Sequence, residues 1–182
     1  MKRVLVPLAP GFEEIEAVTV MDVLRRAGVE VVVAGTAPGP IEGSRGIRLV
    51  PDCTLEEVRV EGFDLIAVPG GTAGVENLAK HPRMLPLLGE FVARGKHVAA
   101  ICAAPALLAA AGLICGKQVT SHPSVREKVA PASLYSEERV ITDGKIITSR
   151  GPGTAMEFAL TLVEILAGPE KVRELKAAML AP

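Results

Sequence analysis

Apolar and polar positions follow one another along the chain in a pattern that predicts repeated β–α units. The segment Arg3–Ala9 (RVLVPLA) is a nearly continuous apolar run, which is typical of a strand covered on both faces. Val29–Thr36 and Asp64–Gly71 repeat this pattern, and His97–Ile101 (HVAAI) is expected to form the fourth strand. Apolar strands that alternate with helices favour a mostly parallel sheet with helices on both of its faces.

The segments between these strands carry helical periodicity. Glu13–Ala27 is expected to form the first helix and to end at Gly28, because glycine is favourable just beyond a helix. The residues that share one face of this helix are apolar: Ala17, Val20, Met21, Leu24 and Ala27. Further helices are predicted for Pro82–Gly95, Cys102–Gly112, Thr154–Ala167 and Pro169–Met179.

Near the C-terminus, Arg139–Arg150 (RVITDGKIITSR) predicts a β-hairpin. Two β-branched runs flank Asp143 and Gly144, a pair of residues that favours a two-residue turn. No repeat or linker interrupts the chain, so residues 1–182 are expected to form one α/β domain.

Composition narrows the class of protein. Of the 182 residues, 49% are hydrophobic, which is enough for a core without disulfides or metal. The 20 basic and 21 acidic residues are mixed along the chain and form no basic patch with aromatics, so nucleic acid is not expected as the main partner. No apolar run reaches the roughly 18 residues of a membrane span. We expect no export signal at the N-terminus and therefore a cytoplasmic location.

The three cysteines fit neither a disulfide framework nor a zinc site, and we predict no metal or organic cofactor. Cys53 and Cys115 have no special context and are expected to be structural. Cys102 differs because it follows a predicted strand and opens a helix. Ligands in parallel α/β sheets bind beyond the carboxyl ends of the strands, where Cys102 and the glycines of Pro69–Gly71 both lie.

A thiol at the start of a helix is expected to ionise readily. Unpaired amides and the positive end of the helix dipole both favour the thiolate, which is the reactive form. The alternative is that Cys102 is a small buried hydrophobe, as free cysteines often are. Its position alone does not separate these two interpretations.

Glu16 lies on the shoulder of the apolar stripe of the first helix, at the same rim of the sheet. A half-buried carboxyl there would have a raised pKa and would serve as a proton donor or acceptor near neutral pH. The alternative, an ordinary solvated glutamate beside Glu13 and Glu14, is favoured when Glu16 is taken by itself.

Gly70 and Gly71 end the third strand, where backbone amides can approach a ligand closely, although a plain tight turn is an equal alternative. His122 follows a short predicted strand and is a candidate to orient a substrate or activate the thiol. A loop histidine more often does neither. The segment Arg150–Thr154 (RGPGT) is interpreted as mostly structural.

Taken together, the sequence resembles the ThiJ/PfpI superfamily, in its parkinsonism-associated protein deglycase branch. The resemblance covers nearly the whole chain and rests on several motifs in the same order. These are GFEEIEAV around Glu16, DVLRRAG at Asp22–Gly28, GSRG around Arg45, VPGG at Val68–Gly71, AAICAAP around Cys102, TSHP at Thr120–Pro123 and TSRGPGT at Thr148–Thr154.

The resemblance implies a flavodoxin-like three-layer sandwich that forms homodimers. It implies that Cys102 is the nucleophile and Glu16 its partner carboxyl. The further residues that it assigns are the oxyanion amides of Gly71 and Ala103, His122 near the thiol, Gly70 in the pocket, and Arg26 and Arg45 around the dimer contact and pocket entrance.

The residue after Cys102 is Ala103, where the intracellular-peptidase branch has histidine. Peptide or ester hydrolysis is therefore disfavoured unless His122 takes that role. The leading hypothesis is cofactor-free conversion of reactive dicarbonyls, such as methylglyoxal to lactate, or removal of early dicarbonyl adducts from protein side chains. The alternative is a redox sensor or stress chaperone that uses oxidation of Cys102. Both hypotheses depend on Cys102 and Glu16, so the sequence does not separate them.

Overall fold

The computed structural model describes residues 1–181 and contains a seven-stranded sheet in the order β10-β11-β7-β6-β1-β2-β5. All neighbouring strands are parallel except β10 and β11, which form an antiparallel hairpin. The strands are β1 (Arg3–Leu8), β2 (Glu30–Gly35), β5 (Cys53–Thr54), β6 (Leu65–Val68), β7 (His97–Ile101), β10 (Val140–Asp143) and β11 (Ile146–Ser149). The predicted mostly parallel sheet with a C-terminal hairpin is confirmed.

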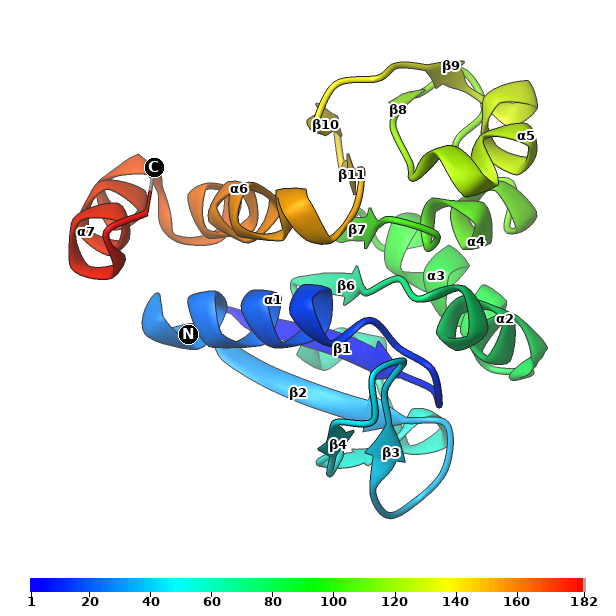
Figure 1. Cartoon of the computed structure of the whole chain (residues 1–182), viewed down its shortest axis with the longest axis horizontal. Helices are drawn as coiled ribbons and strands as arrows, with labels where there is room; N and C mark the ends of the chain where they lie inside the picture. Colours follow the sequence, from blue (N-terminus) through cyan, green and yellow to red (C-terminus); the bar gives the residue numbers. More distant parts are fainter. Residues whose placement is uncertain (182) are drawn as a thin grey trace.

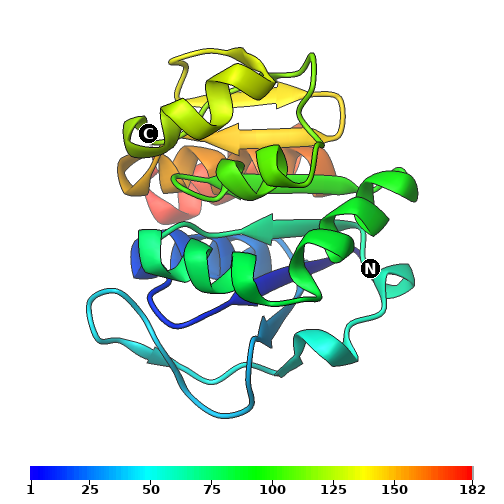
Figure 2. The same ribbon diagram turned by 90° about the vertical axis from the view of Figure 1, so that its right-hand side faces the viewer.

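Helices cover both faces of the sheet (Figures 1 and 2). One face carries α1 (Glu14–Arg26), α6 (Ala155–Ala167) and α7 (Pro169–Met179). The other carries α2 (Thr72–Lys80), α3 (Met84–Ala93), α4 (Pro105–Ala110) and α5 (Arg126–Val129). Short 3₁₀ turns occupy Leu55–Glu57, Val60–Gly62, Pro123–Val125, Ala130–Ala132 and Pro152–Thr154. Among residues 1–181, no helix combines the length and apolar character needed to cross a bilayer.

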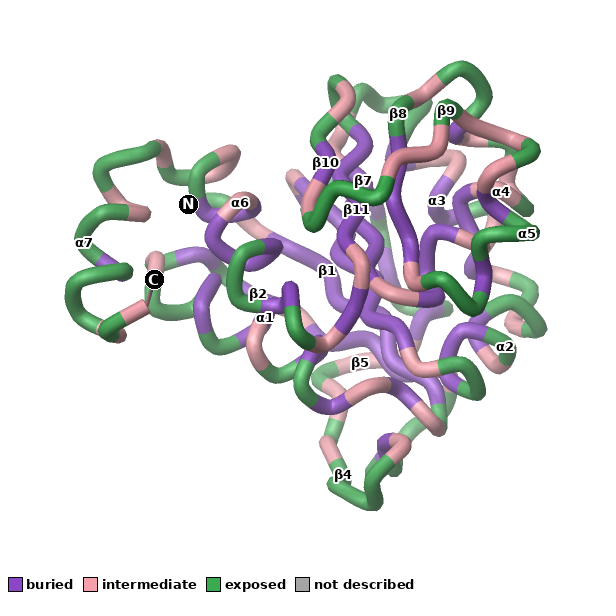
Figure 3. Tube along the Cα trace, turned by 45° about the horizontal axis from the view of Figure 1, so that its top comes forward, coloured by how far each residue is buried: buried purple, intermediate pink, exposed green. Residues whose placement is uncertain are grey.

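The core forms two apolar layers, one on each side of the sheet. The central strands β1, β6 and β7 are buried almost throughout, as their apolar runs predict (Figure 3). The predicted inner face of α1 is buried at Ala17, Val20, Met21 and Leu24, and Gly28 takes the positive φ expected just beyond the helix. The helix predicted over Pro169–Met179 has the same bounds in the structure.

Four local features differ from the sequence-based expectations. The segment Thr72–Lys80 forms α2, which was not predicted. Between β2 and β5 the chain forms a small antiparallel ribbon of β3 (Ile41–Glu42) and β4 (Arg48–Leu49), and a second small sheet pairs β8 (Gln118–Val119) with β9 (Leu134–Tyr135). In the hairpin Asp143 pairs with Ile146, so the two loop residues are Gly144 and Lys145.

The strand order places a crevice at one rim of the sheet. The chain passes from β1 to β2 on one side, whereas β6 and β7 lie on the other side of β1. Loops that leave neighbouring strands in opposite directions open a crevice between them, and this is where parallel α/β sheets bind ligands. The segments that follow β1, β6 and β7 carry Glu16, Gly70 and Cys102.

Candidate active site

Cys102 is the first residue after β7 and has a left-handed backbone, with φ of 65°. This conformation is uncommon for a residue other than glycine and marks a strained turn. Both backbone polar groups of Cys102 are fixed. Its N–H donates to the Ser149 carbonyl at 2.9 Å, and its carbonyl accepts the His122 N–H at 2.8 Å. The predicted helix begins only at Pro105, so the thiol lies on a strand-to-helix elbow and not in the first helical turn.

Glu16 is fully buried, with 0% of its surface exposed, whereas the helical pattern predicted a half-buried side chain. Its Oε2 accepts a hydrogen bond of 2.7 Å from the Gly70 amide. A side chain at Gly70 would not fit, because its Cβ would lie 2.6 Å from the Cys102 Cβ and 2.7 Å from Glu16 Oε2. The glycine therefore allows the thiol and the carboxyl to approach each other.

Burial raises the pKa of Glu16 to about 7, although hydrogen bonds from the Gly70 amide and the Cys102 thiol oppose this effect. The carboxyl can therefore hold or release a proton near neutral pH, as the sequence analysis expected. Its burial is more complete than predicted because the loop after β6 and the Cys102 elbow cover the shoulder of α1.

The pKa of Cys102 is raised to about 12 by burial, by the negative charge of Glu16 and by the hydrogen bond between the two side chains. The expectation that the start of a helix favours the thiolate is thus wrong for the state in which Glu16 is ionised. The two groups titrate as a pair. When the proton lies on the carboxyl, the repulsion is removed, and the amides of Gly71 and Ala103 then oppose only the effect of burial on the thiol pKa.

Gly71 and Ala103 follow β6 and β7, and hydrogen bonds from their backbone amides lower the pKa of the thiol. Gly71 has a φ of 87° and precedes α2. Its missing side chain is essential, because a Cβ there would lie 2.7 Å from the Glu13 amide nitrogen. These two amides form a candidate oxyanion pocket beside the thiol.

His122 follows β8 and lines the same pocket, half-buried. Its Nδ1 lies 2.8 Å from Ser124 Oγ and accepts the Ser124 amide at 3.2 Å. This contact orients the ring and leaves Nε2 as the nitrogen that can serve a substrate.

The pocket has a volume of about 460 Å³. Its lining includes Cys102, His122, Gly71 and Arg45, together with residues that the sequence analysis did not assign to a site: Gly11, Glu13, Ser44, Thr72, Ala73, Ser124 and Pro152. Pro152 belongs to the turn interpreted as mostly structural. A proline before a helix is common and does not by itself indicate a ligand site. Pro152 lines the pocket only because the fold brings its turn close to Cys102.

Arg45 is held at the pocket mouth by Glu14, a buried residue of α1. The Glu14 carboxylate accepts the Arg45 amide at 2.5 Å and the Ser44 hydroxyl at 2.9 Å. Burial alone would raise the pKa of Glu14, but these hydrogen bonds and that of the Ile47 amide together lower it. The charged carboxylate thus attaches the ribbon of β3 and β4 to the start of α1.

Arg26 does not lie with these residues. It is exposed near the C-terminal end of α1, roughly 15 Å along the helix from Glu16, and pairs with Asp22 at 2.7 Å. Within this chain the assignment of Arg26 to the pocket is therefore wrong, and its place at a dimer contact stays a prediction. Cys53 is half-buried and Cys115 is exposed, both away from the pocket lining.

A thiol on an elbow beside a buried carboxyl, at the rim of a flavodoxin-like sheet, defines a class of cysteine-centred α/β proteins. The chain belongs to the DJ-1/PfpI family, which matches residues 2–165. It is 45% identical over 183 residues to the Parkinson disease protein 7 homolog of Danio rerio, covering 98% of this chain and 97% of that protein.

Another relative has an enzymatic name. The chain is 42% identical over 176 residues to the glutathione-independent glyoxalase DJR-1.2 of Caenorhabditis elegans, covering 96% of this chain and 94% of the relative. Among solved structures, Drosophila melanogaster DJ-1beta superposes with a TM-score of 0.96 at 43% identity, covering 100% of this chain and 98% of that one. The family and the flavodoxin-like fold expected from the sequence are confirmed.

Proposed function

We propose that this protein is a cysteine-dependent, cofactor-free enzyme that converts small dicarbonyls to hydroxy acids, with methylglyoxal to lactate as the reference reaction. The observation that carries the proposal is the contact between the Cys102 thiol and the buried Glu16 carboxyl, whose pKa near 7 suits proton transfer at neutral pH. A similar relative that is named a glyoxalase supports the same class of reaction.

In the first step the Cys102 thiolate adds to the aldehyde carbon of methylglyoxal, while Glu16 holds the proton. A C–S bond forms, and the carbonyl π electrons move to oxygen. The amides of Gly71 and Ala103 stabilise this oxyanion until it takes the proton from Glu16 and becomes the hemithioacetal hydroxyl, which leaves Glu16 ionised.

In the second step ionised Glu16 removes the proton from the former aldehyde carbon, and the electron pair moves onto the ketone oxygen to give an enediolate. The C1 hydroxyl proton passes to that oxygen while Glu16 returns its proton to the neighbouring carbon, which leaves a thioester of lactate on Cys102. Water then adds to the thioester, and loss of the thiolate releases lactate. The reaction consumes one water and requires no external oxidant or reductant. Nε2 of His122 is available to hold the substrate oxygen or the attacking water.

The same chemistry could act on early dicarbonyl adducts of protein side chains. The pocket opens at the surface beside Arg45, which is exposed, so a side chain that carries an adduct can approach the thiol. Comparing lactate formation with removal of the adduct from a glycated peptide separates these two substrates.

The test of the proposal is lactate formation from methylglyoxal by purified protein. Cys102→Ser is expected to lower the rate to that of the uncatalysed reaction, and the exposed Cys115→Ser is the matched control that keeps it. A Cys102→Ser variant with wild-type turnover, or a wild-type protein with none, would remove the proposal.

Redox sensing is the second candidate function, and the same contact favours it. A protonated Glu16 can hydrogen-bond to an oxidised Cys102 and stop oxidation at the sulfinate. Mass spectrometry after mild peroxide treatment distinguishes the two functions. Selective conversion of Cys102 to sulfinate without turnover of any dicarbonyl would favour sensing.

We do not extend the proposal to peptide hydrolysis. Ala103 follows the thiol in place of histidine. Among the described residues, the ring of the pocket histidine, His122, hydrogen-bonds to Ser124 and not to the Cys102 thiol, so the geometry does not supply the Cys–His pair that peptide cleavage needs.

We also propose that the protein forms a homodimer, as the family resemblance implies. Two exposed apolar side chains of α1, Ile15 and Val18, lie on the same helix face. Ile47 and Val50 on the neighbouring ribbon segment are exposed as well, and Glu14 joins this segment to α1. Exposed apolar side chains on these two joined segments support contact with a second copy.

A further inference from the structure

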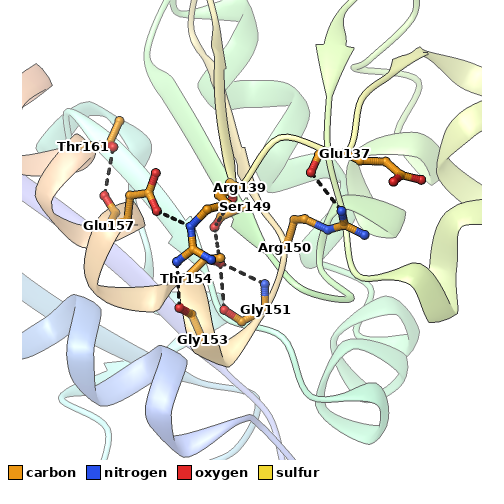
Figure 4. Close-up of polar contacts among 9 residues, drawn as sticks. All are labelled: Glu137, Arg139, Ser149, Arg150, Gly151, Gly153, Thr154, Glu157 and Thr161. Atoms are coloured by element: carbon orange, nitrogen blue, oxygen red, sulfur yellow. Dashed lines mark hydrogen bonds and ion pairs between the residues drawn. The ribbon is translucent and has the colours of Figure 1, made fainter.

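Two buried hydroxyl groups lie behind the Cys102 elbow, outside the candidate catalytic residues. Ser149 ends β11, and Thr154 ends the turn that follows (Figure 4). Ser149 is fully buried and Thr154 nearly so. Their hydroxyl oxygens lie 2.6 Å apart and share a hydrogen bond. A buried hydroxyl pair of this kind rigidifies the backbone segments that it joins.

The hydroxyl pair connects the end of β11 to two flanking segments. Ser149 Oγ donates to the Arg139 carbonyl at 2.9 Å, just before β10. Thr154 Oγ1 accepts the Gly151 amide at 3.1 Å and lies 2.9 Å from the Gly151 carbonyl oxygen. The Ser149 hydroxyl therefore ties the end of β11 to the segment before β10 and to the following turn, in addition to the pairing of β11 within the sheet.

The Ser149 main chain in turn holds the thiol. The Ser149 carbonyl accepts the Cys102 amide, one of the two backbone hydrogen bonds that fix the left-handed elbow. The turn that Thr154 closes also contains Pro152, which forms a wall of the pocket. A shift of the β11 end would move the sulfur and the pocket wall together.

Arg139 supports the same turn from outside, as Figure 4 shows. Its Nη2 donates to the Gly153 carbonyl at 3.0 Å, and its Nε pairs with Glu157 at 2.7 Å on the first turn of α6. Because these groups are exposed, the buried hydroxyl pair is the part of the network that solvent cannot replace.

We infer that Ser149 and Thr154 are positioning residues for Cys102. Their hydroxyl pair sets where the Cys102 amide is held, and so sets the distance from the sulfur to Glu16 and to the amides of Gly71 and Ala103. The inference rests on the proposed function only in taking Cys102 as the reacting residue, and the thiol can be followed without turnover.

The test compares Thr154→Val, which removes the hydroxyl at nearly constant volume, with the conservative variant Thr154→Ser. Thr161→Val is the matched control, because the Thr161 hydroxyl donates only to the Glu157 carbonyl within α6. The readout is the pH profile of alkylation of Cys102 by iodoacetamide in the full-length protein. Exposed Cys115 in the same sample serves as the internal reference.

In Thr154→Val the midpoint of the pH profile of Cys102 alkylation is expected to move toward the midpoint for Cys115 by about half a pH unit or more. The reason is that the thiol leaves its fixed place beside Glu16. Thr154→Ser should restore the wild-type profile, and Thr161→Val should retain it. In the lactate assay Thr154→Val should lower kcat more than it raises KM. Should Thr154→Val fail to fold, Ser149→Ala is measured in the same way.

A merely structural role predicts a lower melting temperature with the Cys102 profile of the folded protein unchanged, and that result overturns the inference. A wild-type Cys102 profile that coincides with that of Cys115 also overturns it. A wild-type protein that makes no lactate but shows the shift in Thr154→Val refutes the proposed function and leaves the positioning role supported.

Discussion

The backbone amide of Gly70 donates a hydrogen bond of 2.7 Å to Oε2 of Glu16, across 54 residues of sequence. This contact joins the end of β6 to the first turns of α1 and holds the carboxyl against the Cys102 elbow. Glu16 Oε1 is also buried and has no hydrogen-bond partner among the described residues. An oxygen in that environment favours the protonated carboxyl.

Replacing Gly70 with alanine is expected to abolish turnover. The new Cβ would lie within 3 Å of both the Cys102 side chain and the Glu16 carboxyl, so one of them must move. Gly89→Ala is the matched control. Gly89 lies inside α3, nothing lies within 4 Å of the added Cβ, and the change should stabilise the fold by about 1 kcal/mol. Wild-type kcat/KM in Gly70→Ala would show that the close approach is not required.

Glu16 also makes stability depend on pH. Its pKa is about 7 in the folded protein and near 4.5 in the unfolded chain, so the folded protein binds more protons between these values. The free energy of unfolding therefore falls as pH rises from about 4.5 to 7. Glu16→Gln removes this loss and should be more stable than wild type at pH 8, by roughly 3 kcal/mol, and equal to it near pH 4.

Urea unfolding of both proteins at several pH values between 4 and 8 measures this difference. If the free energy of unfolding depends on pH in the same way in the wild type and in Glu16→Gln, the carboxyl ionises at its ordinary pKa.

Replacement by valine is expected to have different effects on stability at two buried threonines, Thr148 and Thr120. The Thr148 hydroxyl accepts the Thr120 amide at 2.9 Å, whereas the Thr120 hydroxyl is buried with no hydrogen-bond partner in the described residues. Thr148→Val should lower the free energy of unfolding by about 1–3 kcal/mol, because it leaves a buried amide unpaired. Thr120→Val should leave it unchanged or raise it by about 1 kcal/mol.

Each variant serves as the control for the other in thermal or urea unfolding. Equal destabilisation by both substitutions would contradict the hydrogen-bond assignment.

Dimer formation is expected to depend on the exposed apolar residues of α1. Ile15→Asp should shift the protein from dimer to monomer in sedimentation velocity, because it introduces a charge into the proposed contact. Leu134→Asp is the control, since Leu134 is equally exposed but lies on β9. A monomeric wild type would refute the proposed dimer. An Ile15→Asp variant that stays dimeric would show that the contact does not include this face of α1.

Local sequence predicted the elements whose patterns are strong. The continuous apolar runs of β1 and β7 and the period of α1 are properties of short segments, and the structure contains all three. The helix α2 was missed because its sequence, TAGVENLAK, is short and contains an internal glycine. That glycine is needed for packing, since a Cβ at Gly74 would lie 2.8 Å from the Phe12 main chain. Such a reason is invisible until distant segments are brought together.

In the candidate site, too, some features were predicted from the sequence and others depend on distant segments. The places of Cys102 and Glu16 at one rim of the sheet follow from strand order, and both were anticipated. The complete burial of Glu16 was not, because residues 54 and 86 positions away in sequence cover it. The raised thiol pKa has a similar origin, since burial raises it most and the Glu16 charge that adds to the effect lies on α1, distant from Cys102 in the chain. Arg26 was misplaced because sequence likeness does not reveal which end of a helix faces the pocket.

The central claim is that Glu16 moves the proton for a substrate bound to Cys102. Its most direct test is the rate of lactate formation from methylglyoxal by Glu16→Gln at pH 7, per folded site titrated by alkylation of Cys102. We predict a rate about 10²–10⁴-fold below wild type with Cys102 still alkylated, because the amide cannot transfer the proton. A Glu16→Gln rate within about twofold of wild type would contradict the mechanism, since the loss of general acid–base catalysis is expected to exceed that margin.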